Sequence, residues 1–220
     1  MPTHFWCWSE SDAAIIESWN QTLGGSHRVL VGGSPLLQRT EERCSEARDE
    51  IDALLRASGK KRYGLVTLQP GAANAPPDWV LQALREAPSD ILWGIRIHPM
   101  MWSEEDAVRA RFDRLGAGRF DVTLSSRLPL VCLLARTTVH VTGFSSTVLE
   151  ASSFGVTSVT FHPEAPSFYP DVEAAGRMNF VTSRDEMVRA LEAVSVAPTA
   201  RATSHFGDRL GELLGSSPVS

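Results

Sequence analysis

Residues 138–155 read TVHVTGFSSTVLEASSFG. The apolar run at 139–141 (VHV) predicts a buried strand, and Thr142 and Gly143 lead from it to three consecutive hydroxyl side chains and a helical pattern over 146–154. A strand that passes into a helix is part of a βαβ crossover, which connects parallel strands. The stretch therefore favours a parallel sheet and places hydroxyl groups where a strand ends.

The same alternation of strand and helix continues along the chain. Short β-branched or aromatic runs predict strands at 63–68, 91–97, 120–124, 139–141 and 158–161, with a further candidate at 179–181. Helical patterns fall between and after them, at 77–85, 104–115, 128–135, 146–154 and 184–193. We predict an α/β fold with a Rossmann-like parallel sheet and helices on both faces. In such sheets ligands bind beyond the carboxyl ends of the strands.

The earlier part of the chain is less regular. A strand is expected at 27–31 and an amphipathic helix at 41–57, followed by Ser58 and Gly59. We expect three segments: N-terminal linker elements at 1–59, the Rossmann-like domain at 60–195, and a C-terminal tail with a short helix at 196–220. Three of the six tryptophans lie within the first forty residues, where they would pack against the domain or form an interface.

Composition narrows the classes of function. The 220 residues are 43% hydrophobic and carry a formal net charge of −5, which gives no electrostatic footprint for nucleic acid. Three widely spaced cysteines without a CxxC pair are expected to be free thiols in a reducing compartment. Neither a signal sequence nor a run of 18 apolar residues is visible. These observations predict a cytoplasmic protein with small-molecule ligands and no transmembrane segment.

Candidate binding groups follow the predicted strands. His98 and Pro99 end the strand at 91–97, where the proline fixes the exit and the imidazole can donate to a phosphate oxygen. Gln69 and Gly71 lie in a turn-rich loop after 63–68, which either lets backbone amides approach a ligand or is an ordinary loop. Ser126, after 120–124, is a candidate helix cap whose loop could also contact a base.

The hydroxyl run has two interpretations. A helix N-terminus offers unpaired amides to a phosphate, and the Ser145 and Ser146 hydroxyls add donors. Alternatively, Ser146 alone caps the helix, or Thr147 and Glu150 form a capping box.

Taken in order, these motifs resemble a known family. An RxHP segment at 96–99, a Ser-x-x-Pro-Leu helix at 126–130 and a strand leading to Ser-Ser-x-x-x-Glu at 145–150 resemble the C-terminal nucleotide-binding half of GT-B glycosyltransferases. The resemblance is to bacterial surface-polysaccharide enzymes of sialyltransferase-like, capsule Kdo-transferase-like and polyol-phosphate-transferase-like type. It implies that His98 contacts the donor phosphate and stabilises it as a leaving group, with Ser145 and Ser146 on the same phosphate.

The resemblance also implies a function. Glu150 would accept from the ribose hydroxyls of a CMP- or CDP-linked donor, and the chain would serve capsule or other polysaccharide biosynthesis with a glycan acceptor and with neither a metal nor a cofactor. The full expected donor-binding set is Gln69, Gly71, His98, Pro99, Ser126, Gly143, Ser145, Ser146, Thr147 and Glu150.

Other parts of the family pattern are missing. Complete GT-B enzymes carry an N-terminal domain with the acceptor site and usually the base, and no acidic base is evident here. The run Glu104, Glu105 and Asp106 is expected to be a solvated first turn, and His162-Pro163 either flanks the acceptor or is a plain loop.

Two alternatives therefore stay open. One is an epimerase-like enzyme with Glu150 and Asp171 as its acids. The other is a non-catalytic scaffolding subunit that joins a partner chain or a second copy through residues 1–59.

Overall fold

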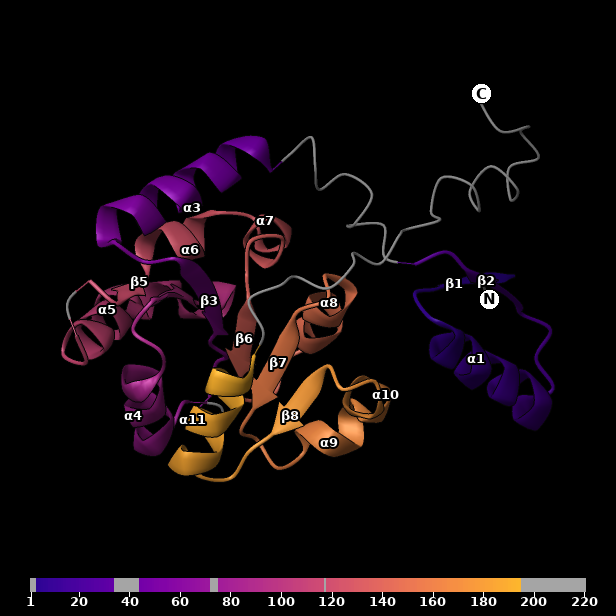
Figure 1. The fold of residues 1–220 in the computed structure, drawn as a ribbon. Helices are drawn as coiled ribbons and strands as arrows, with labels where there is room; N and C mark the ends of the chain where they lie inside the picture. The colour runs from indigo at the N-terminus through magenta and orange to yellow at the C-terminus, as the bar shows by residue number, and fades with distance from the viewer. Residues whose placement is uncertain (1–2, 34–43, 72–74, 117, 195–220) are drawn as a thin grey trace. The chain divides into compact units, whose positions relative to one another are not determined.

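The computed structural model describes residues 3–33, 44–71, 75–116 and 118–194 (Figure 1). These residues divide into two compact units, of which the first contains 3–33 and the second contains the described residues from 44 to 194. The expected C-terminal tail with a short helix lies outside the described residues. In the described ranges, no helix combines the length and the apolar character that crossing a membrane requires. The two units are considered separately.

The N-terminal unit is a small βαβ motif. Strand β1 (His4–Cys7) pairs in parallel with β2 (Arg28–Val31), and helix α1 (Glu10–Leu23) connects them. Ser9 and Asp12 form a capping box at the start of α1. Of this motif, the sequence pattern predicts only the strand, at 27–31.

Aromatic side chains pack within this N-terminal unit. The Trp6 ring lies where a side chain at Gly32 would stand, and its Nε1 donates to the Gly33 carbonyl at 2.8 Å. Phe5 meets His27 edge-on, with the ring centroids 5.0 Å apart. Helix α1 exposes three apolar side chains four residues apart: Ile15, Trp19 and Leu23. Packing within this unit thus accounts for Trp6 and Phe5, whereas Trp19 is exposed.

The second unit contains a six-stranded, all-parallel sheet, as the sequence predicts. Its strands are β3 (Arg62–Thr67), β4 (Ile91–Arg96), β5 (Phe120–Asp121), β6 (Val139–Thr142), β7 (Thr157–Thr160) and β8 (Met178–Phe180). The order across the sheet is β5-β4-β3-β6-β7-β8. The chain therefore builds outward from β3 to one edge, returns to place β6 beside β3, and builds to the other edge. The ligand crevice of such a sheet lies at this reversal, between β3 and β6.

Helices cover both faces of the sheet. They are α3 (Ser45–Ser58), α4 (Asp78–Glu86), α5 (Glu105–Asp113), α6 (Thr123–Arg127), α7 (Leu130–Leu134), α8 (Thr147–Ser153), α9 (Ala165–Phe168), α10 (Pro170–Ala174) and α11 (Arg184–Ala193), with the 3-10 helix η3 (Pro99–Glu104) before α5. Figure 1 shows α4 and α11 on one face and α3, α6 and α7 on the other.

The face under α4, α5 and α11 forms the main apolar core. Alternate side chains of the strands point into it and meet buried residues of the three helices. Its members include Val66, Trp93, Ile95, Val141, Val159, Leu84, Phe112 and Met187.

The opposite face carries several buried polar side chains, and most of those on the central strands bond one another. His140 is fully buried on β6, and its two ring nitrogens lie 2.9 Å from the Thr67 and Ser158 hydroxyls on the flanking strands. Burial lowers the pKa of His140 to about 3, so the ring is neutral. Tyr63 and Ser125 share a hydrogen bond of 2.7 Å on the same face.

Three expectations differ from the structure. The strand expected at 120–124 ends at Asp121, because the Asp121 carboxylate accepts the Leu124 and Ser125 N–H groups and begins α6. The prediction of free thiols is wrong for Cys44 and Cys132, which form a disulfide, while Cys7 is free and buried.

The third difference concerns the boundary expected near residue 60. Helix α3 belongs to the unit that contains the sheet. The disulfide joins its N-cap residue, Cys44, to α7, and Arg136 donates to Asp52 at 2.7 Å. Residues 44–59 thus lie on the sheet side of the boundary.

Candidate functional site

His98 stands in a tight turn at the carboxyl end of β4. Its carbonyl accepts the Met101 N–H at 2.7 Å, and its Nδ1 accepts the Met100 N–H at 3.2 Å, with Pro99 at the second position of the turn. Because Nδ1 is an acceptor, the neutral ring carries its proton on Nε2. His98 is therefore a half-exposed N–H donor through Nε2.

The loops after β3 and β6 are joined at the reversal of the sheet. Gln69 follows β3, and its Oε1 accepts the N–H of Phe144, the residue before the hydroxyl run, at 3.2 Å. Gly71 has a φ of 97°, in the region that favours glycine, so the turn of this loop depends on it. The structure thus brings Gln69 together with the 143–147 segment.

Ser145 and Ser146 differ in their hydrogen bonds and in their exposure. The Ser145 Oγ accepts the Thr147 N–H at 3.2 Å, and its hydroxyl donates to the Thr147 Oγ1 at 2.9 Å. Ser146 is the exposed N-cap residue of α8, and its side chain makes no capping bond. Thr147 and Gly143 are buried. Ser145 thus shapes the turn, and Ser146 offers its hydroxyl outward.

Glu150 does not complete a capping box. Its Oε2 is buried and accepts no hydrogen bond from the part of the chain that the structure describes. Burial raises the pKa of the Glu150 carboxyl, and the positive charge of Arg96 partly offsets that rise. Of the two interpretations left open, the structure removes the capping box and leaves an acceptor without a donor.

Arg96, the first residue of the RxHP segment, has a structural role that the sequence pattern does not predict. Its Nη1 donates to the carbonyls of Ser125 at 3.0 Å and Leu128 at 2.6 Å, which ties α6 and its C-cap residue to β4. Burial lowers the pKa of Arg96. The sequence does carry a signal for this role, because Arg96 is a single arginine at the end of a run that predicts a buried strand.

The hydroxyl of Ser126, like that of Ser145, bonds within the fold. The Ile97 N–H donates to the Ser126 Oγ at 3.1 Å, and the Ser126 hydroxyl lies 3.3 Å from the Ile95 carbonyl. The side chain is buried, and its hydroxyl bonds backbone groups of the β4 segment that a neighbouring strand would otherwise bond. It is neither a helix cap nor a free donor.

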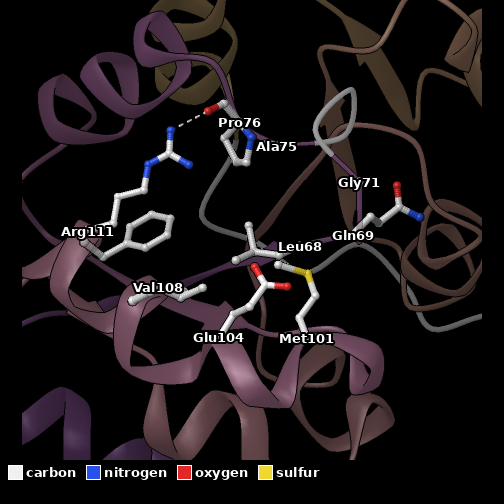
Figure 2. Close-up of a pocket in the computed structure, with 11 residues that line it drawn as sticks. Leu68, Gln69, Gly71, Ala75, Pro76, Met101, Glu104, Val108 and Arg111 are labelled. Atoms are coloured by element: carbon white, nitrogen blue, oxygen red, sulfur yellow. Dashed lines mark hydrogen bonds between the residues drawn. The ribbon is translucent and has the colours of Figure 1, made fainter.

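A cavity of about 430 Å³ lies between the loop after β3, η3 and α5. Figure 2 shows Met101 and Glu104 extending toward Leu68, and Arg111 of α5 donating to the Pro76 carbonyl. The expected solvated turn at 104–106 therefore lends one side chain to a cavity. The full lining is Leu68, Gln69, Gly71, Ala75, Pro76, Met101, Glu104, Ala107, Val108, Arg111 and Phe112.

The chain is similar to several solved structures. A UDP-GlcNAc 2-epimerase from Methanocaldococcus jannaschii, in complex with UDP-GlcNAc and UDP, matches 97% of this chain at 15% identity and a TM-score of 0.61. MnaA from S. aureus, in a structure with UDP, matches 96% at 14% identity and a TM-score of 0.63. The wall teichoic acid polymerase TagF, soaked with CDPG, matches 87% at 15% identity and a TM-score of 0.58.

These comparisons define the fold. The chain spans 61%, 58% and 47% of those three chains, respectively. No protein-family model matches the sequence, and no curated protein matches it significantly. The expected fold class is thereby confirmed: an α/β, Rossmann-like fold of the kind found in one half of GT-B glycosyltransferases and related epimerases.

Proposed function

We propose that this chain binds the nucleotide-sugar donor of a glycosyltransferase at the reversal of its sheet. The observation that carries the proposal is the placement of two outward donors on either side of β3: the Nε2–H of His98 after β4 and the hydroxyl of Ser146 after β6. Glu150 adds an acceptor without a donor on the next helix turn. Donors and an acceptor at this point suit a phosphate and a ribose.

The chemistry follows from these groups. A phosphate oxygen accepts from His98 and Ser146, and each hydrogen bond to a charged group contributes about 1.5–3 kcal/mol. The ribose hydroxyls donate to the Glu150 carboxylate. When the bond between the sugar and the phosphate breaks, charge grows on the phosphate, and the His98 donor strengthens as it does so.

The finer assignments belong to the same proposal. We infer a CMP- or CDP-linked donor, a glycan acceptor, a role in bacterial surface-polysaccharide synthesis in the cytoplasm, and no requirement for a metal or cofactor. The fold likeness includes chains solved with UDP and with CDPG, which supports a nucleotide ligand. Because this chain spans only part of those proteins, the acceptor site and base are assigned to a further domain or partner chain.

Calorimetric titration with CMP, CDP and UDP tests the proposal. His98→Asn keeps an acceptor for the Met100 N–H but lacks the Nε2 donor, so it should weaken binding at least about tenfold, or about 1.4 kcal/mol. The Ser145→Ala/Ser146→Ala pair should do the same. Ser153→Ala, at the other end of α8, is the matched control. Absence of binding at millimolar nucleotide would overturn the proposal.

A scaffolding role is the second candidate, because α1 exposes Ile15, Trp19 and Leu23 along one side. Sedimentation velocity over a concentration series tests it. Self-association that Trp19→Glu abolishes would support this role. A strict monomer that binds nucleotide would argue against it.

A further inference from the structure

The turn at His98-Pro99 has a counterpart at His162-Pro163, after β7. The His162 carbonyl accepts the Ala165 N–H at 3.0 Å, and its Nδ1 accepts the Glu164 N–H at 3.3 Å. These are the same two bonds, to the third and second residues along, that shape the His98 turn. Strands β4 and β7 are thus each followed by a histidine turn with the same two hydrogen bonds.

The consequence for the ring is also the same. With Nδ1 as an acceptor, the neutral imidazole carries its proton on Nε2. The His162 side chain is half-exposed, and its Nε2 makes no hydrogen bond within the described ranges. The turn requires only the Nδ1 acceptor, which an asparagine would also supply. The outward Nε2–H is left for a ligand.

His162 borders the proposed phosphate site on the side opposite His98. Its ring packs on Phe144 with centroids 5.6 Å apart, and the Phe144 N–H donates to Gln69. Phe168 and Tyr169 hold the Phe144 ring from other sides, with centroids at 4.7 Å and 5.8 Å. The carboxyl ends of β3, β6 and β7 are therefore joined by direct contacts, and His162 has a fixed place next to the hydroxyl run.

The spacing of the two histidines indicates what they bind together. Strands β4 and β7 are three strand intervals apart, which is about 14 Å. Two side chains that extend toward each other from these strands do not both contact a single phosphate group. The two linked phosphates of a diphosphate cover more of the distance between the strands. The nearby cavity is a poorer place for a second phosphate, because the Glu104 carboxylate lines it.

We propose that His162 donates its Nε2–H to the second phosphate of a nucleoside diphosphate, and that the chain therefore selects diphosphates over monophosphates. This inference rests on the proposed nucleotide site. It assigns His98 to the phosphate shared by both ligands and His162 to the one that only the diphosphate carries. In a CDP-linked donor the sugar is bonded to this second phosphate, so there His162, rather than His98, donates to the phosphate on which charge grows when the bond to the sugar breaks. Within the proposed function, it favours a diphosphate-linked donor such as a CDP-sugar over a CMP-sugar.

Titration of the full chain with CMP and CDP tests the inference. The wild-type protein should bind CDP at least about tenfold more tightly than CMP. His162→Asn, which keeps the turn and lacks the donor, should lose most of that difference by weakening CDP alone. His162→Gln, whose longer amide can place an N–H near the Nε2 position, should retain part of it. His98→Asn should weaken both ligands.

Each result has a distinct meaning. Equal losses for CMP and CDP in His162→Asn, or no loss for either, would overturn the role of His162 while the nucleotide site stands. Failure of the wild-type protein to bind either nucleotide would overturn the site itself. Thermal melting of His162→Asn verifies the fold, and His4→Asn, an exposed histidine in the N-terminal unit, is the control substitution.

Discussion

A fall in pH from 7.5 to 5.0 should destabilise this protein through one residue, His140. The folded chain holds this imidazole neutral, with a pKa of about 3, because it is fully buried between two strands. In the unfolded chain the same ring titrates near 6.5. Below about pH 6.5, unfolding therefore takes up a proton, and the free energy of unfolding falls as the pH falls toward 3.

The magnitude follows from the two pKa values. A pH of 5.0 lies about 1.5 units below the pKa of the imidazole in the unfolded chain. In the folded chain the imidazole is still neutral at this pH. Each unit corresponds to 1.36 kcal/mol, so the loss between pH 7.5 and pH 5.0 is about 2 kcal/mol. That is a large share of the total for a domain whose stability is about 5–15 kcal/mol.

Urea denaturation at the two pH values, followed by circular dichroism, measures the effect. His140→Gln removes the titrating ring and retains an amide that can bond Thr67 or Ser158. Carboxylates titrate alike in both proteins, so the difference between their pH dependences isolates His140. We expect the wild-type protein to lose about 2 kcal/mol more than the variant. Equal losses in the two proteins would show that His140 does not cause this pH dependence.

Three further predictions address other parts of the structure. Cys44→Ser should lower the free energy of unfolding by about 4 kcal/mol, because the disulfide closes a loop with a sequence separation of 88; an unchanged urea midpoint would contradict this. Gly94→Ala should destabilise by about 2 kcal/mol in the same assay, since its Cβ would lie 1.9 Å from the Tyr63 hydroxyl, and full stability would contradict that packing. Glu150→Gln should not lower the melting temperature at pH 8, because burial raises the pKa of this carboxyl and so disfavours its charged form, while nucleotide affinity falls. A marked drop in melting temperature would make Glu150 structural.

The sheet was predictable because its strands are short β-branched runs between helical patterns. The helix expected at 184–193 has those bounds as α11, and the strand expected at 91–97 is β4 with one residue fewer. The β1–α1 pair was missed although Ser9 and Asp12 carry a capping-box signal. There the aromatic residues masked the periodicity.

The remaining errors depend on contacts between distant residues. No spacing rule could pair Cys44 with Cys132, because only the packing of α3 on α7 brings them together. Likewise, Ser126 and Ser146 both look in the sequence like a serine that follows a strand. In the structure the hydroxyl of Ser126 bonds the backbone of β4, whereas that of Ser146 makes no capping bond. The turn at His98 was inferred from its proline, yet the ring orientation depends on the Met100 N–H.

Chemical-shift mapping of the amide groups during titration with CDP tests the nucleotide site most directly. We predict that the largest changes fall in three segments far apart in sequence, 98–101 after β4, 144–147 after β6 and 162–165 after β7, and that residues of the N-terminal unit change little. An absence of changes at millimolar CDP, or changes confined to other segments, would contradict this prediction.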